Sequence, residues 1–368
     1  MSWFSGIINK NNRIKNFIPS NRWFHYSNGA ILDYGDKGKA IWIADSSWFE
    51  KWFFGVEERL GSILGKMLIQ ASSESTEYFL ISNQIQIPKN KDIGGWNELL
   101  EDWSYKNFGS FSSHSKSPNE TNIIINNYAN LYIAIGSLSG AFEYLTNNRY
   151  KFRWNDSETS IILNFEPISD IFPPPSPIQN DLHVDISDSK KINNPELWEM
   201  FSINNKGIWH IHNSRKMVIS NDLFIRFEQK SLPFLSDVKF GRLGDYDWKL
   251  SDENKSNWWS ASADSARELF IESAHHILIR EDDDWKQVGQ KHLGMYGLGR
   301  IIQAKSLDDF GETFFELESL FHPSVVCGIL LACWERAYGK KGRLILTMNK
   351  EDFFVKISSS HDTLTPQY

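Results

Sequence analysis

The chain has 368 residues, and its 41% hydrophobic and 23% charged residues are typical of a folding, globular protein. The formal net charge of −7 argues against the basic field of a nucleic-acid-binding protein, so we expect no nucleic-acid partner. Phe, Trp and Tyr make up 14% of the residues, and 15 of these are Trp. A chain so rich in aromatic residues needs a thick core, large apolar contact surfaces, or both.

The cysteines and the apolar runs limit the cellular compartments in which we expect this protein. The two cysteines, Cys327 and Cys333, lie in one apolar segment and cannot build a disulfide framework or a cysteine-based zinc site. The N-terminal residues lack the pattern of a signal peptide. The longest apolar run, 325–334, is far shorter than the roughly 20 residues of a membrane-spanning helix. We therefore expect a cytoplasmic protein without a membrane span.

The first half of the chain predicts a mixed set of elements. They are, in order, strands at 30–32 and 40–43, an aromatic helix start at 46–54, an amphipathic run at 56–70, a Trp-led segment at 96–103, an apolar helix at 131–145, and a hairpin of strands 150–154 and 161–165. Asn147 can adopt the left-handed conformation that ends a helix, so the apolar helix should stop there.

A proline-rich stretch divides the chain. Residues 166–195 contain Pro173, Pro174, Pro175 and Pro177, followed by a polar stretch. Consecutive prolines hold the chain extended and remove hydrogen-bond donors. We therefore predict a first domain at 1–165, a linker at 166–195 and a second domain at 196–368.

The second half predicts the same kinds of element in the same order. They are strands at 217–219 and 223–227, an aromatic helix start at 257–262, an amphipathic run at 266–279, a Trp-led segment at 285–295, an apolar helix at 325–337 ending at Gly339, and a hairpin at 343–357.

A shift of 192 positions aligns 136–165 with 328–357 without a gap. Only Gly136/Gly328, Leu138/Leu330 and Glu143/Glu335 are identical, but the apolar and polar classes match along the window. The small residues in the two apolar helices predict a close approach by another element. The chain therefore predicts an α+β fold of two tandem repeats, each a helical layer on an antiparallel sheet that ends in a helix and a β-hairpin.

The closing helix and hairpin carry a resemblance to a known family. The stretches are 126–142 (NNYANLYIAIGSLSGAF) and 318–334 (ESLFHPSVVCGILLACW), with the strands 150–165 and 343–357 that follow them. They resemble the 4-vinyl reductase domain, whose fold is shared with subunits of the transport protein particle (TRAPP), over about a third of each half. The resemblance implies a pocket for an apolar ligand or a scaffold for partner proteins. Several members carry metal-binding cysteines in the closing hairpin, and these strands have none, so no metal site is implied here.

The aromatic clusters are the main candidates for a binding surface. Five large rings between 48 and 54 are too many for one helical face, which indicates either burial on several sides or rings offered to a ligand or partner. A core role is the first interpretation, and an apolar pocket or an interface between repeats is the alternative. The residues chosen for ligand or partner binding are Trp48, Trp52, Phe53, Trp103, Phe142, Trp258, Trp259, Trp285, His292 and Trp334.

The histidines supply the candidate chemistry. In a strand, His210 and His212 would share one face, yet no third metal ligand is visible, so a hydrogen-bonded surface is the simpler interpretation. His275 and His276 would point to different sides of a helix. His292 lies near an amphipathic face and is more typical of a core histidine than of a haem ligand. The glycines at 294, 297 and 299 do not have the spacing of a phosphate loop.

These patterns favour a non-enzymatic protein that binds an apolar small molecule or a partner protein, including a second copy of the chain. We assign no catalytic residue, metal or cofactor. One alternative is an enzyme that uses His210, His212 or His292 as acid–base residues in a cleft between the repeats. Another is a subunit of a larger assembly.

Overall fold

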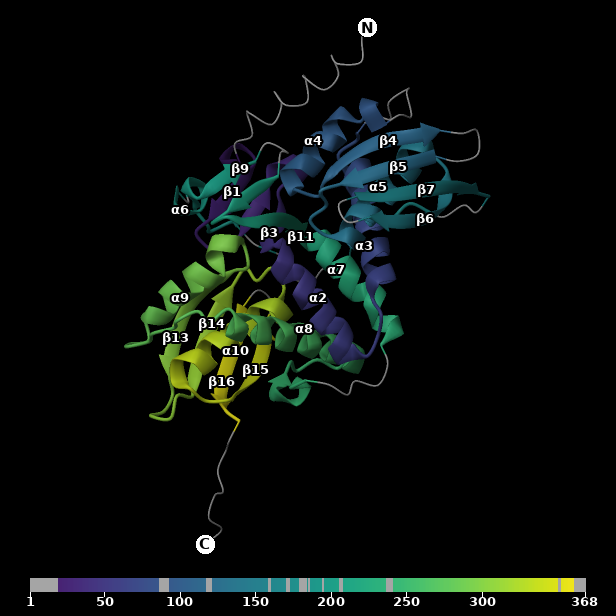
Figure 1. The fold of residues 1–368 in the computed structure, drawn as a ribbon. Helices are drawn as coiled ribbons and strands as arrows, with labels where there is room; N and C mark the ends of the chain where they lie inside the picture. The colour runs from purple at the N-terminus through teal and green to yellow at the C-terminus, as the bar shows by residue number, and fades with distance from the viewer. Residues whose placement is uncertain are drawn as a thin grey trace.

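A computed structural model describes residues 19–85, 93–116, 121–157, 160–169, 173–178, 184, 186–193, 195–204, 208–235, 241–349 and 352–360 (Figure 1). The N-terminal residues judged for a signal peptide lie outside these ranges, as do parts of the proline-rich stretch. Of that stretch, β7 continues to Ile168, and 173–178 form neither helix nor strand. The Arg226 side chain donates a hydrogen bond of 2.8 Å to the Ser176 carbonyl.

The first half of the chain begins with three strands, continues with three helices and ends with two strand pairs around a helix. Its elements are β1 (Trp23–Tyr26), β2 (Ile31–Asp33), β3 (Lys39–Asp45), α2 (Ser46–Leu60), α3 (Gly65–Ser82), α4 (Asn97–Lys106), β4 (Ser110–Lys116), β5 (Thr121–Asn126), α5 (Leu131–Thr146), β6 (Arg149–Ser157) and β7 (Ser160–Ile168).

The second half has the same order, with two short strands and a short helix added. Its elements are β8 (Lys191–Ile192), α6 (Pro195–Glu199), β9 (Phe201–Ile203), β10 (Trp209–Ile211), β11 (Ser214–Ser220), α7 (Asn221–Ser231), β12 (Tyr246–Asp247), α8 (Glu253–Glu272), α9 (Asp284–His292), β13 (Arg300–Ser306), β14 (Thr313–Glu318), α10 (Pro323–Tyr338), β15 (Gly342–Asn349) and β16 (Asp352–Ser359).

The predicted α+β class with antiparallel sheets is confirmed. The first half closes on a sheet of order β4-β5-β7-β6, and the second on β13-β14-β16-β15 with β12 added in parallel beside β15. Figure 1 shows these two sheets at opposite ends of the molecule. The closing helix and hairpin were predicted in both halves, and both are present. The further statement that the halves are copies of one fold stays a prediction.

A third sheet joins the two halves. Within the described residues its order is β8-β1-β2-β3-β11-β10-β9, and β3 pairs antiparallel with β11, with Ile43 opposite Val218. Both strands run directly into a helix. The Asp45 carboxylate accepts a hydrogen bond from the Trp48 N–H at the start of α2, and the Ser220 hydroxyl accepts one from the Leu223 N–H at the start of α7. The central strands therefore direct two helices out of one sheet.

Each of these two helices packs on the other half of the chain. In α2, the Trp52 indole N–H donates to the Ser262 carbonyl of α8 at 3.1 Å, and the Ser265 hydroxyl donates to the Trp52 carbonyl at 3.0 Å. In α7, Lys230 forms an ion pair of 2.6 Å with Glu74 of α3. The halves are thus held together by an exchange of helices as well as by the central sheet.

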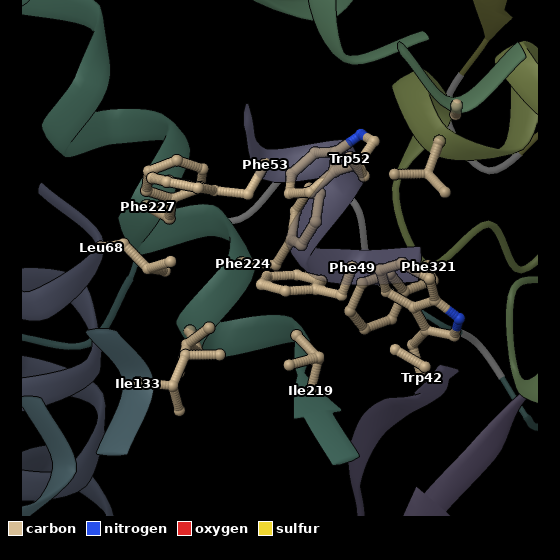
Figure 2. Close-up of a cluster of buried hydrophobic side chains, with 14 of the residues drawn as sticks. Trp42, Phe49, Trp52, Phe53, Leu68, Ile133, Ile219, Phe224, Phe227 and Phe321 are labelled. Atoms are coloured by element: carbon tan, nitrogen blue, oxygen red, sulfur yellow. The ribbon is translucent and has the colours of Figure 1, made fainter. Parts of the chain in front are cut away.

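The aromatic core is continuous across both halves. Figure 2 shows rings from α2 and α7 interleaved between Phe227 at one end and Phe321 and Trp42 at the other. The Trp52 and Phe224 rings are stacked with centroids 5.3 Å apart, and both side chains are buried. One cluster of buried residues includes the helices and the closing sheets of both halves. The exchanged helices carry rings from one half into the other, so one core spans both halves.

The predicted close approach at the small residues of the apolar helices is confirmed. A methyl group at Gly136 would lie 2.3 Å from the Ile69 carbonyl oxygen of α3. One at Gly328 would lie 2.1 Å from the Ala263 carbonyl oxygen of α8. Only glycine allows the helix backbones to approach this closely.

One aligned pair of residues makes the same hydrogen bond in each half. The Glu143 carboxylate accepts a hydrogen bond of 3.1 Å from the Tyr150 N–H, where β6 begins. The Glu335 carboxylate accepts one of 2.9 Å from the Gly342 N–H, where β15 begins. The shift of 192 positions thus relates side chains with the same local role, and each carboxylate fixes the entry into the closing hairpin.

Three predicted elements are wrong. Residues 223–227 belong to helix α7, because the Ser220 cap starts a helix that is buried on every side from Asn221 to Glu228. The run 56–70 is two helices, since Gly61 adopts a left-handed conformation and ends α2. Helix α8 ends at Glu272, so 273–279 lie beyond it. As a result Trp258 and Trp259 belong to the second helix after β11, and the counterpart of the aromatic helix α2 in the element order is α7.

Candidate ligand-binding cleft

A cleft of about 490 Å³ opens between the two halves. The first half supplies residues of β3 and of the first turns of α2, and the second half supplies β11, the end of α8, α9, α10 and the loop before β13. The lining residues are Trp42, Ile43, Asp45, Ser47, Trp48, Lys51, Lys216, Leu269, Phe270, Glu272, Ser273, His275, His292, Tyr296, Leu298 and Ile329. This volume and the mixture of rings with a few polar groups are typical of small-molecule sites.

Aromatic side chains form much of the wall. Trp42 and Trp48 meet edge to face with ring centroids 5.6 Å apart. Trp42 extends from β3, and Trp48 lies in the first turn of α2, where the Asp45 cap fixes the helix start. From the second half, Phe270 at the end of α8 and Tyr296 after α9 complete the wall. The pairing of β3 with β11 and the packing of α2 on α8 bring these rings together.

An ion pair lies on the wall at the end of the central strands. The Lys216 ammonium is 3.2 Å from the Asp45 carboxylate and 5.6 Å from the centre of the Tyr296 ring. The Asp45 carboxylate also accepts hydrogen bonds from the Ser214 hydroxyl and the Trp48 N–H. Burial raises the pKa of Asp45, but the hydrogen bonds and Lys216 outweigh burial and hold this pKa below its usual value. The Asp45 side chain is therefore ionised, and both of its carboxylate oxygens already accept hydrogen bonds.

Two histidines of the second half also line the cleft. The rings of His275 and His292 have centroids 5.0 Å apart, and Phe270 lies within 5.2 Å of both. Burial, the neighbouring His275 and Lys291 lower the pKa of His292 to about 4. Burial, followed by nearby cations, lowers the pKa of His275 as well. Both imidazoles are therefore neutral near pH 7.

The cleft contains two of the ten residues predicted for binding, Trp48 and His292. The structure places the other eight in the buried core, which was the first interpretation of the aromatic clusters. They are Trp52, Phe53, Trp103, Phe142, Trp258, Trp259, Trp285 and Trp334, each no more than 3% exposed.

The structure contradicts the predictions for the histidines of the pairs His210/His212 and His275/His276. His210 lies in β10, but His212 has a positive φ of 52° and forms the two-residue turn to β11 with Asn213. The prediction that a strand puts His210 and His212 on one face is therefore wrong, since a turn with two left-handed residues ends the strand first. His275 and His276 are not in a helix, because α8 ends before them.

Several residues of the cleft were missed. Trp42, Lys216 and Tyr296 are spread over three elements, and no local spacing connects them. His275 was set aside because the amphipathic run was extended past the end of α8. The usable signal was the sequence Asp45-Ser46-Ser47 directly after an apolar strand, which marks a helix start at a strand end.

A buried histidine network resembles a catalytic triad in composition only. The Ser324 hydroxyl is 2.8 Å from His322 Nδ1, and His322 Nε2 is 2.7 Å from the Glu228 carboxylate. His322 and Ser324 are 0% exposed, and the rings of Trp258 and Trp259 lie within 5.7 Å of the imidazole. No substrate can reach these groups, so they connect α7 with the start of α10.

A second cavity is too small for a ligand. It lies beside Asp36, Asp102 and Lys106 and has a volume of about 20 Å³, enough for one water molecule. Lys106 forms an ion pair of 2.8 Å with Asp102. The larger cleft is therefore the candidate site.

In the part of the chain that the structure describes, no three His, Cys, Asp or Glu residues are grouped so that they could hold a metal ion. No described helix has the length and apolar character to cross a membrane. Comparison with protein-family models, curated proteins and solved structures finds no match. The resemblance to the 4-vinyl reductase domain therefore stays a prediction.

Proposed function

We propose that this chain binds a small molecule with an apolar ring in the cleft between its halves. The observation that carries the proposal is a cavity of about 490 Å³ with Trp42, Trp48, Phe270 and Tyr296 on its wall. Rings of this kind gain free energy from burying a flat apolar ligand and position it through edge-to-face and stacked contacts. The pocket for an apolar ligand that the 4-vinyl reductase resemblance implies is consistent with this function.

The proposal is tested with N-phenyl-1-naphthylamine, an uncharged fluorescent ring compound. We expect a saturable rise in its fluorescence with one site per chain. Trp48→Ala removes a ring of the wall and should weaken binding about tenfold. Phe54→Ala is the matched control, because Phe54 is on the same helix, 48% exposed, and does not line the cleft. Absence of saturable binding, or equal affinity of the two variants, would contradict the proposal.

Acid–base chemistry in the same cleft is a second candidate function, favoured by the contact between His275 and His292. A pKa of about 4 makes His292 a weak base near pH 7, so we rank binding above catalysis. Native mass spectrometry of protein purified from its host would identify a co-purified small molecule, oligomer or partner. Conversion of that molecule by the protein, lost in His292→Gln, would favour the enzyme. A complex with a partner and no bound molecule would favour a subunit of an assembly.

A further inference from the structure

The wall of the cleft offers a hydrogen-bond donor that the protein leaves unused. Trp42 is 4% exposed, and among the described residues its indole N–H has no hydrogen-bond acceptor. In Figure 2 the Trp42 indole nitrogen lies on the side of the ring that faces away from Phe49. This nitrogen is not among the fully buried polar atoms of the described residues, so water reaches the N–H and a ligand acceptor in the cleft can take the place of that water.

A second donor is a buried ammonium group. Lys216 is 9% exposed, and Asp45 is the one acceptor it has within the described residues. An ammonium group has three N–H donors, so Lys216 can bind a further acceptor. Because Asp45 is already engaged by Ser214 and by the Trp48 N–H, its charge is spread over several donors. The Lys216 ammonium is therefore the cation that remains accessible to an anion inside the cleft.

Acceptors on the wall are few by comparison. Asp45 is engaged, and Glu272 is on the exposed rim. His275 and His292 are neutral and offer one lone pair each. A ligand cation would therefore meet no free carboxylate inside the cleft, whereas a ligand anion would meet the Lys216 ammonium.

We propose that the ligand of this cleft is an aromatic carboxylate, whose ring packs against Trp48 and Tyr296 and whose carboxylate accepts a hydrogen bond from the Lys216 ammonium. This inference rests on the proposed function of the cleft and specifies its ligand class. A charge-assisted hydrogen bond to a carboxylate is stronger than one to a neutral carbonyl, and low exposure strengthens it further. The cleft should therefore distinguish ligands of the same ring by the charge of their polar group.

Isothermal titration calorimetry with 2-naphthoate, 2-naphthamide and 2-naphthylmethylammonium tests the inference, since the three probes share one ring. We expect 2-naphthoate to bind at least tenfold more tightly than 2-naphthamide, and the ammonium compound most weakly. Lys216→Met should remove the preference for 2-naphthoate and leave 2-naphthamide within about threefold. Lys66→Met is the matched control, because Lys66 is an exposed lysine on α3 that does not line the cleft, and it should change the preference less than threefold.

Equal affinity of the unmodified protein for 2-naphthoate and 2-naphthamide would overturn the carboxylate inference while the proposed function stands. Binding of none of the three probes would refute both. If Lys216→Met does not fold, a salt titration of the unmodified protein takes its place. A higher salt concentration should lower the affinity for 2-naphthoate and leave the affinity for 2-naphthamide unchanged. An equal response of the two affinities would overturn the role of the ammonium group.

Discussion

Replacing Gly328 or Gly136 with alanine tests whether the close helix contacts hold each half together. Alanine favours a helix over glycine by about 1 kcal/mol, so both changes would stabilise an isolated helix. In the structure, however, the added methyl group lies 2.1 Å from the Ala263 carbonyl oxygen at Gly328 and 2.3 Å from the Ile69 carbonyl oxygen at Gly136. These oxygens belong to the backbones of α8 and α3 and cannot rotate away.

The size of the effect follows from these distances. Ordinary contact needs about 3.5 Å, so α10 and α8 would have to separate by about 1 Å or more. Overpacking of a buried contact costs about 1–3 kcal/mol, and a clash with rigid backbone lies at the upper end. After the gain in helix propensity, we expect each variant to lower the free energy of unfolding by about 2 kcal/mol.

Urea unfolding followed by tryptophan fluorescence measures this change. Gly244→Ala is the matched control, because a methyl group there has no neighbour within 4 Å and the residue does not have a positive φ. We expect the control to stay within about 0.5 kcal/mol of the unmodified protein. If Gly328→Ala or Gly136→Ala were as stable as the control, the reasoning on close helix packing would be refuted.

Three further predictions concern buried groups. Burial lowers the pKa of His25, which is 3% exposed, to about 4, so between pH 6.5 and 4 the unfolded chain binds the extra proton and stability falls as the pH is lowered. We expect His25 to lower the free energy of unfolding by about 2 kcal/mol between pH 7 and pH 5. In His25→Gln the melting temperature should therefore depend less on pH over this range. Burial raises the pKa of the Cys327 and Cys333 thiols. Iodoacetamide at pH 8 should therefore label both cysteines in urea and neither in the folded protein. Rapid labelling of the folded protein would contradict their burial. Glu335→Gln should lower the free energy of unfolding by about 2 kcal/mol, because two arginines and a backbone N–H lose the carboxylate that they contact. The control Lys286→Gln breaks an exposed ion pair and should change the free energy of unfolding by less than about 0.5 kcal/mol. Equal effects of the two changes would argue against the Glu335 network.

Local sequence signals determined the elements that close each half. Asn147 and Gly339 both adopt the left-handed conformation and end α5 and α10 where the sequence predicts. The hairpins after them were predicted from apolar alternation around polar turns, and the glycines within the helices predicted their close packing. These features depend on neighbours within a few residues, so a single sequence contains the information for them.

The same kind of signal was misread where a short apolar run followed a cap. The run 223–227 has the length of a strand, and only the Ser220 cap marks it as a helix. The error shifted the comparison between the halves by one helix and hid the exchange of α2 and α7. Trp52 and Trp258 were binding candidates because their segments are dense in rings, and both lie in the shared core, as the first interpretation has it.

The tertiary structure alone decided which residues form the cleft. The sequence determined that Trp48 lies at a helix start and that the chain has far more rings than one small core requires. It did not connect Trp48 with Lys216 or His292, which are separated from it by more than a hundred residues. That connection comes from the pairing of β3 with β11 and the packing of α2 on α8. The physical reason is that contacts between distant segments depend on the fit of whole surfaces, and no local pattern of residue types records that fit.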